Sequence, residues 1–210
     1  MFANTLSPDT LRGIKLIGQG KWLDFAYLAG GTALALRLGH RQSVDLDFFT
    51  PKKFDEQVIL MQLKQTGRFE SKTVAWRTVI GDFFKVSFSL FYYEYSVLDK
   101  TDDFFGIKIA SLKDIAAMKI HAIEDRGSKR DFVDLFFLTK TFSLREMLNF
   151  YGQKYHCLEK HKLFILKGMN YFEDAESEKM RPMFKEVDWD KLKQYFQNQV
   201  KQLAKEWGIL

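Results

Sequence analysis

The segment 29-AGGTALALRLGHRQSVDLDFF-49 begins with two glycines that interrupt an apolar stretch. The residues before them, 24-DFAYLA-29, have the pattern of a buried strand, and Thr32 begins a short helical pattern that its side chain is expected to cap. The order strand, Gly30-Gly31, helix places backbone N–H groups at a helix N-terminus, and glycine lets an anion approach them closely. The alternative is a plain tight turn, but the order predicts a phosphate-binding turn.

The same segment ends in two acids that alternate with apolar residues in 44-VDLDFF-49. This alternation predicts a strand in which Asp45 and Asp47 share one face, with Cα atoms roughly 6.5–7 Å apart. Two carboxylates so placed repel each other unless a cation lies between them, and Mg²⁺ prefers oxygen ligands. The alternative is a pair of acids on the wet face of an edge strand. Together with the glycines, the pair favours a site for a metal and a nucleotide.

The hydrophobic periodicity predicts a mixed α/β part followed by a helical part, with the change near residue 111. The first part is expected to contain helices over 8–19, 32–39 and 53–66, and strands over 24–29, 44–49, 69–78, 83–93 and 106–110, with 79-VIGD-82 as a turn. The second is expected to contain helices over 112–126, 131–141, 143–152, 158–168 and 188–206. Because no linker separates residues 1–110 from 111–210, the two parts are expected to pack together.

The bulk properties of the chain are those of a globular protein. It has 210 residues, 46% of them hydrophobic and 28% charged, with a net charge of +5 and a sequence pI of about 9.1. No apolar run approaches the ~20 residues of a membrane span, the N-terminus lacks a signal-peptide pattern, and one cysteine excludes an internal disulfide. We therefore expect a cytoplasmic protein without membrane contact.

Basic residues concentrate in 154-KYHCLEKHKLFILKG-168. The net positive charge favours polyanionic partners, and this cluster is a candidate for part of a nucleic-acid surface. A solvated helix face explains the same pattern and is the more common case.

Lys119 lies among apolar residues at helical spacing, since Ile115, Ala116, Ala122 and Ile123 are its neighbours one turn before and after. Such a lysine is expected to lie against the protein body, where it either extends its ammonium to solvent or contacts an anion such as a triphosphate. A turn at Gly127-Ser128 follows, and then Asp131 and Asp134 come one helical turn apart. An acid in the first turn of a helix can also serve only the helix dipole.

The blocks GGTALALRLGHRQSVDLDFF and GIKIASLKDIAAMKIHAIEDRGSKRDFVDLFFL, in this order, resemble the signature of the AbiEii/AbiGii toxin family, and 171-YFEDAESEKMRPMFKEVDWDKLKQYF-196 resembles the usual ending of the family. These proteins have a nucleotidyltransferase fold distantly related to DNA polymerase beta. The resemblance implies an α+β fold, in which a small mixed sheet with flanking helices precedes a helical C-terminal part that completes the active site. It also implies transfer of a nucleoside monophosphate from an NTP, with release of pyrophosphate.

The resemblance also implies roles for particular residues. Gly30, Gly31 and Thr32 match the motif that holds the NTP phosphates, and Asp45 and Asp47 match the acids that bind Mg²⁺ or Mn²⁺. Arg41 and Ser43 precede these acids and are expected near the nucleotide. Lys119 matches the lysine that contacts phosphate, and Asp131 matches the acid of the last motif. Family members are often toxins paired with an antitoxin, and some relatives modify the acceptor end of tRNA.

One position departs from the pattern of polymerase-beta-like transferases, which often carry a third carboxylate on a later central strand. The candidate strand here, 83-FFKVSFSLFYYEY-95, has Lys85, Ser87 and Ser89 on its more polar face. The third acid normally helps to deprotonate the attacking hydroxyl and to hold the catalytic metal. Its absence leaves open whether Asp131 supplies a base or the metals suffice.

The sequence therefore predicts an Mg²⁺-dependent nucleotidyltransferase that moves NMP from an NTP to a hydroxyl of RNA, tRNA or protein, as a toxin of a toxin–antitoxin or phage-defence system. Two alternatives remain open at this point. One is a catalytically impaired module of the same fold that binds an NTP or a protein partner. The other is a kinase that transfers the γ-phosphate.

Overall fold

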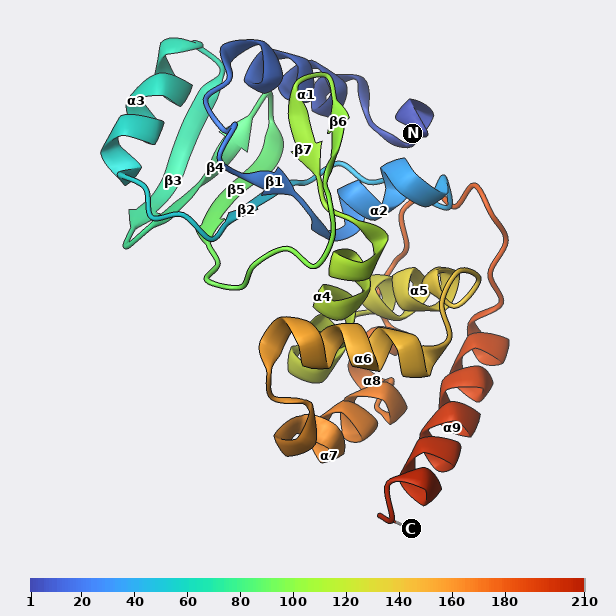
Figure 1. Cartoon of the computed structure of the whole chain (residues 1–210). Helices are drawn as coiled ribbons and strands as arrows, with labels where there is room; N and C mark the ends of the chain where they lie inside the picture. Colours follow the sequence, from blue (N-terminus) through green and yellow to red (C-terminus); the bar gives the residue numbers. More distant parts are fainter. Residues whose placement is uncertain (210) are drawn as a thin grey trace. The chain divides into compact units, whose positions relative to one another are not determined.

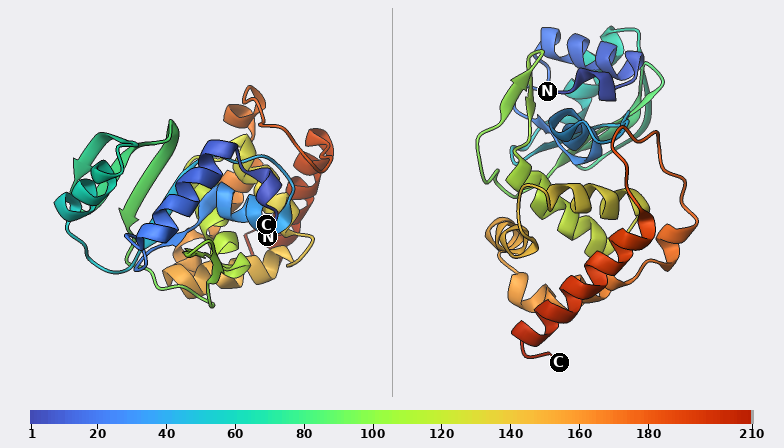
Figure 2. Two further views of the ribbon diagram at one scale, coloured as in Figure 1. Left: turned by 90° about the horizontal axis from the view of Figure 1, so that it is seen from above. Right: turned by 90° about the vertical axis from the view of Figure 1, so that its right-hand side faces the viewer.

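The computed structural model describes residues 1–209, and the chain divides into two compact units, Met1–Ser111 and Leu112–Leu210. The first unit is built around a sheet, and the second consists of helices joined by loops (Figures 1 and 2). Each unit is described separately below.

The first unit contains a seven-stranded mixed sheet with the strand order β3-β4-β5-β2-β1-β7-β6. The pairs β2/β5 and β1/β7 are parallel, and the other neighbours are antiparallel. The strands are β1 (Tyr27–Leu28), β2 (Leu46–Thr50), β3 (Phe69–Ala75), β4 (Thr78–Phe83), β5 (Val86–Tyr92), β6 (Asp102–Phe104) and β7 (Ile107–Ile109). This mixed sheet with flanking helices confirms the fold class predicted from the sequence.

Four helical segments accompany the sheet: η1 (Ala3–Thr5), α1 (Pro8–Gly20), α2 (Gly30–Leu38) and α3 (Glu56–Gln65). Helix α1 packs on the apolar face of the sheet, where Gly13 lies against the side chains of Leu46 and Phe83. Leu46 and Phe48 on β2 are fully buried on this face, whereas the alternate residue Asp47 is half-buried on the other. The apolar face therefore forms the core of the unit, and the opposite face of β2 carries the acid.

The predicted turn at 79-VIGD-82 is wrong, because these residues lie inside β4. Gly81 and Asp82 suggested a turn, but Gly81 has a different cause: a Cβ there would overlap the backbone of Glu70 and the ring of Phe69, next to a register shift in β3. The turn that follows β4 is made by Phe84 and Lys85, which adopt left-handed backbone angles (φ 54° and 63°) without any glycine. The sequence signal for a turn was therefore absent where the turn lies.

The other predicted strands are present, but most of them are shorter than expected, and one observed strand was not predicted. β1 has two residues where six were expected, and β6 was not predicted. β6 pairs with β7 through a turn at Phe105-Gly106, where both residues have positive φ. Asp45 precedes β2 and lies outside the strand that was expected to contain it.

The second unit contains six helices among its described residues: α4 (Leu112–Asp125), α5 (Lys129–Leu138), α6 (Leu144–Tyr155), α7 (Leu158–Asn170), α8 (Glu173–Glu176) and α9 (Trp189–Glu206). Five of these were predicted, and the short α8 was not. Helix α4 packs against α5, α6 and α7 (Figure 1). Ser143 begins α6 with a capping box to Glu146, which explains the sharp start of that helix.

Candidate active site

The glycine turn after β1 is the first element of the candidate site. Helix α2 begins at Gly30 itself, whose φ of +66° favours glycine, and its N-cap is Ala29. A Cβ on Gly31 would overlap the guanidinium of Arg41, so this position also requires glycine. The first backbone N–H groups of a helix have no acceptor within the helix, and with the helix dipole they form an anion site.

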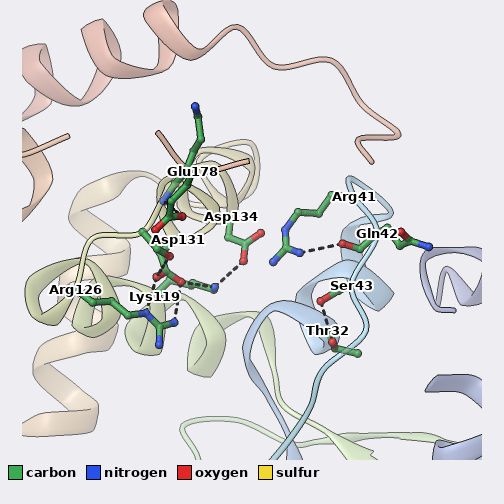
Figure 3. A network of polar contacts seen from close by, with 11 residues as sticks. Thr32, Arg41, Gln42, Ser43, Lys119, Arg126, Asp131, Asp134 and Glu178 are labelled. Atoms are coloured by element: carbon green, nitrogen blue, oxygen red, sulfur yellow. Dashed lines mark hydrogen bonds and ion pairs between the residues drawn. The ribbon is translucent and has the colours of Figure 1, made fainter. Parts of the chain in front are cut away.

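Thr32 does not cap this helix, contrary to the sequence prediction. It lies within α2, buried, and its hydroxyl donates to the hydroxyl of Ser43 at 2.9 Å (Figure 3). Ser43 is fixed in turn, because its backbone N–H donates to the carbonyl of Thr5. Thr32 therefore ties the helix to the loop that leads into β2.

Arg41 lies in that loop and is buried, with 3% of its surface exposed. Its Nη1 donates to the backbone carbonyl of Gln42 at 3.0 Å (Figure 3), and its Nη2 packs over Gly31. The predicted nucleotide-binding residues Gly31, Thr32, Arg41 and Ser43 are thus neighbours in the structure. A buried arginine beside a helix N-terminus adds positive charge to the anion site.

Asp45 and Asp47 flank the start of β2, and both are half-buried. The carbonyl of Asp47 accepts from the N–H of Ala29 at 3.0 Å, which ties β2 to the residue before the glycine turn. The carboxylate of Asp47 also faces this turn, since its Oδ2 is 3.5 Å from the position that a Cβ on Gly30 would take. An acid therefore lies directly beside the candidate phosphate site.

Ser89 occupies the strand position next to Asp47. The two residues are partners in the parallel pairing of β2 and β5, and the Ser89 hydroxyl donates to Asp47 Oδ1 at 2.6 Å. Ser89 belongs to the polar face of the strand on which the family resemblance implies a third carboxylate that this chain lacks. The described residues 1–209 contain no group of three or more histidine, cysteine or acidic side chains that could hold a metal ion.

Two carboxylates without a third still suit Mg²⁺, because this ion is usually held by one or two carboxylates together with substrate phosphates. Asp47 provides one such carboxylate beside the anion site at Gly30, and Asp45, just before β2, is the candidate for the second. The donor set therefore fits a cation that is shared between protein and triphosphate.

The second unit holds Lys119 and Asp131 in one buried ion cluster (Figure 3). Lys119 Nζ on α4 lies 2.8 Å from Asp131 Oδ1 and 2.6 Å from Asp134 Oδ2, and both carboxylates on α5 are fully buried. Arg126 Nε lies 2.9 Å from Asp131 Oδ2, which also accepts from the hydroxyl of Ser128 at 2.5 Å. The cluster pairs two cations with two acids.

This environment determines the protonation of Asp131. Burial by itself would raise the pKa of the carboxyl, but the charge of Lys119 and the hydrogen bonds and charge of Arg126 outweigh it and hold the pKa below its ordinary value. Asp131 is therefore a stable carboxylate. Because a general base works best with a pKa near the operating pH, Asp131 is better suited to holding Lys119 than to accepting a proton.

The sequence predicts the burial of Lys119 but not the residues that it contacts. The apolar neighbours of Lys119 predicted that it faces the protein body, and it does, with 4% of the residue exposed. The sequence places Asp131 and Asp134 one helical turn apart, but this spacing does not indicate that both acids contact one lysine. The sequence indicates only a turn at Ser128, whereas in the structure its hydroxyl donates to the Asp131 carboxylate.

The basic residues of segment 154–168 differ in burial and in their ion pairs, so they form neither a uniformly solvated face nor a uniform nucleic-acid patch. Lys154 is buried and pairs with the buried Asp114 at 2.8 Å, and Lys162 pairs with Glu159 at 2.7 Å. His161 pairs with Glu124. The expectation of a basic face is therefore wrong for Lys154, whereas the side chains exposed to solvent in this segment include Lys160 and Lys167.

Comparison with solved structures identifies the fold. The chain superimposes on JHP933 from Helicobacter pylori with a TM-score of 0.56 at 21% identity, covering 97% of this chain and 95% of that one. It superimposes on MenT4, a nucleotidyltransferase toxin from Mycobacterium tuberculosis H37Rv, with a TM-score of 0.57 at 16% identity, covering 95% and 85%. These similarities show a nucleotidyltransferase fold.

Sequence comparison identifies the family. The model of the family described as "Nucleotidyl transferase AbiEii toxin, Type IV TA system" matches residues 16–88 and 68–207. A relative from Aquifex aeolicus (strain VF5), named "Uncharacterized protein aq_aa25", is 39% identical over 197 residues, which cover 90% of this chain and 92% of the relative. The chain belongs to the AbiEii family of nucleotidyl transferase toxins. Within residues 1–209, no helix is both long and apolar enough to cross a membrane.

Proposed function

We propose that the protein transfers a nucleoside monophosphate from an NTP to an acceptor hydroxyl in an Mg²⁺-dependent reaction. The observation that carries this proposal is the position of the Asp47 carboxylate beside the glycine turn at Gly30. It brings an acid suited to a hard cation next to backbone N–H groups suited to phosphate, within one unit of the structure. Family membership supports the same reaction class.

In this proposal the residues of the first unit bind and orient the triphosphate. The N-terminus of α2 receives phosphate oxygens, and the buried Arg41 adds positive charge to that site. Asp45 and Asp47 hold Mg²⁺, which when bound neutralises charge on the triphosphate. The acceptor oxygen attacks the α-phosphorus, the bond from this phosphorus to the bridging oxygen breaks, pyrophosphate leaves, and the proton of the acceptor passes to solvent.

Lys119 is the proposed contribution of the helical unit. As a cation it stabilises negative charge on the phosphates in the transition state. Asp131 and Asp134 hold its ammonium in place, at 2.8 Å and 2.6 Å. The proposal thus assigns catalytic roles to Asp45, Asp47 and Lys119, a positioning role to Asp131, and completion of the active site to the unit from Leu112 onward.

The acceptor is proposed to be RNA, with tRNA or a protein hydroxyl as the other possibilities. The exposed Lys160 and Lys167 on α7 support RNA, because lysines that are not engaged in buried pairs can neutralise phosphates. The toxin family supports a cognate antitoxin as a partner and a cytoplasmic site of action.

Labelling with α-³²P and γ-³²P nucleotides tests the proposal. Each NTP is incubated with the protein, total RNA and Mg²⁺, and labelled products are resolved from free nucleotide. Transfer of the α-label with release of pyrophosphate is expected, and Asp45→Asn is expected to abolish it while the protein stays folded. Unchanged labelling by this variant, or transfer of the γ-label alone, would contradict the proposal.

A second candidate, a module that binds NTP without turnover, is favoured by one observation. The strand partner of Asp47 is Ser89 and not an acid, so the neighbouring strand supplies no third carboxylate beside Asp47 to assist deprotonation. NTP binding without release of pyrophosphate over a wide range of acceptors would identify this function.

A further inference from the structure

We propose that Ser89 is a positioning residue that orients the carboxylate of Asp47, and that the serine makes cation binding depend on bound nucleotide. This inference rests on the proposed function, since it concerns the same cation. It goes beyond that function in assigning a role to Ser89 and a binding order to the site.

The geometry of the two residues is set by the sheet. Asp47 and Ser89 are direct partners in the parallel pair β2/β5, so their side chains project from the same face. The Ser89 hydroxyl donates to Asp47 Oδ1 at 2.6 Å, and only 6% of Ser89 is exposed. A short hydrogen bond to a charged group on a rigid strand restricts rotation of the carboxylate.

The hydrogen bond from Ser89 also determines which oxygen of Asp47 faces the glycine turn. With Oδ1 bonded to Ser89, Asp47 Oδ2 faces the Gly30 position, at 3.5 Å from where a Cβ would lie. Gly30 has no side chain that would fill this space. Ser89 therefore presents Oδ2 towards the turn where the triphosphate is proposed to bind, and this oxygen is the one that a shared cation would take.

The serine at position 89 also accounts for the proposed dependence of cation binding on the nucleotide. An acid at residue 89 would be a third anionic ligand, whereas serine adds no charge. Two carboxylates are a small ligand set for Mg²⁺, which completes its shell with phosphates and water. We therefore expect weak cation binding by the protein alone and stronger binding when the triphosphate supplies further oxygens.

Binding of Mn²⁺, followed by electron paramagnetic resonance, tests this inference without relying on activity. Titrations are run with Mn²⁺ alone and with each nucleotide as its non-hydrolysable α,β-methylene analogue. The wild type is expected to bind Mn²⁺ much more tightly with one or more analogues. Ser89→Ala is expected to weaken this binding about tenfold, the factor that corresponds to loss of one hydrogen bond to a charged group, and Ser89→Thr, which keeps the hydroxyl, is expected to restore it.

Ser89→Asp provides the opposite test. Side chains of neighbouring strands are about 5 Å apart, so two carboxylates there repel each other unless a cation is bound. This variant is expected to melt at a lower temperature without metal, to regain stability with Mn²⁺, and to bind Mn²⁺ without nucleotide at least tenfold more tightly than the wild type. Ser87→Ala and Ser71→Asp are the matched controls, since both residues are exposed strand serines, and neither is expected to change Mn²⁺ affinity.

The outcomes separate this inference from the proposed function. If the wild type binds Mn²⁺ with nucleotide and Ser89→Ala binds it equally well, the positioning role is wrong and the proposed function stands. If Mn²⁺ binds the wild type equally tightly with and without nucleotide, the binding order is wrong. Absence of Mn²⁺ binding under every condition, together with α-label transfer that survives Asp45→Asn, would overturn both.

Discussion

Lys119 and Asp131 form a buried ion pair, with 2.8 Å between Nζ and Oδ1. The lysine comes from α4 and the acid from α5, and 5% and 0% of their side chains are exposed. Two helices of the second unit are therefore joined by two charged residues to which the family resemblance gives roles in the reaction. The pair therefore links Lys119, the lysine proposed to contact phosphate, to the stability of the helical unit.

The first prediction concerns the removal of this acid. Asp131→Asn leaves Lys119 and Arg126 without one of their carboxylates, and breaking a buried pair from one side costs about 3–5 kcal/mol. The free energy of unfolding, measured by urea denaturation, should fall by this order. Asp125→Asn removes an exposed acid from α4 and should change it little. Equal stability of the two variants would show that the cluster does not stabilise the fold.

The second prediction is that the contribution of Asp131 to the free energy of unfolding depends on pH. The pKa of Asp131 is lowered in the folded protein, so its stabilising effect is fully present above the unfolded value of about 3.9 and is lost as the pH falls through the folded value. The stability difference between wild type and Asp131→Asn should therefore be constant from about pH 5 to 7 and should shrink below about pH 4. A difference that grew on acidification would contradict the lowered pKa.

The third prediction separates Lys154 from the surface lysines. Lys154 and Asp114 are both fully buried side chains 2.8 Å apart, so Lys154→Ala should destabilise the protein by about 3–5 kcal/mol. Replacing both residues, as Lys154→Met with Asp114→Leu, should cost less than either single change, because no buried charge is left unpaired. Calorimetric unfolding of Lys154→Ala, of Lys154→Met and Asp114→Leu singly, and of the double replacement checks this order.

The fourth prediction concerns the acceptor surface. Lys160 and Lys167 are exposed on α7, so their reversal to glutamate should weaken RNA binding and make log K less dependent on log salt concentration. Lys201→Glu combined with Lys205→Glu, both exposed on α9, is the control for the same change in net charge. Unaltered RNA affinity and salt slope in the double variant would rule out this surface.

The fifth prediction tests the glycine turn. Gly31→Ala must displace the guanidinium of Arg41, since the added methyl group would overlap it. We expect NTP affinity to fall at least tenfold, with a stability cost of about 1–3 kcal/mol for overpacking. Gly152→Ala makes the same change where a Cβ meets only ordinary contacts, and it should leave NTP binding intact. Isothermal titration calorimetry measures the NTP affinity of both variants, and urea denaturation measures their free energy of unfolding.

Much of the fold followed from local pattern, because alternation and helical periodicity record which side of an element is buried. The helices over 8–19 and 188–206 and the strand around Asp47 were predicted close to their observed bounds. The strand over Thr78–Phe83 was not, because Gly81 has a packing cause that resembles a turn signal. The turn at Phe84-Lys85 had no signal of its own, since neither residue is typical of left-handed backbone.

Residue type and spacing alone predict the elements of the candidate site in their order along the chain. These are a glycine turn at the start of a helix, two acids at the start of the next strand, and a lysine on an apolar helix face. These are local features, encoded by residue type and spacing. Tertiary structure alone decided that Ser89, 42 residues away, bonds Asp47, and that Lys119 lies between Asp131 and Asp134. Strand register and helix packing create these contacts, and both depend on how distant segments fill a shared core.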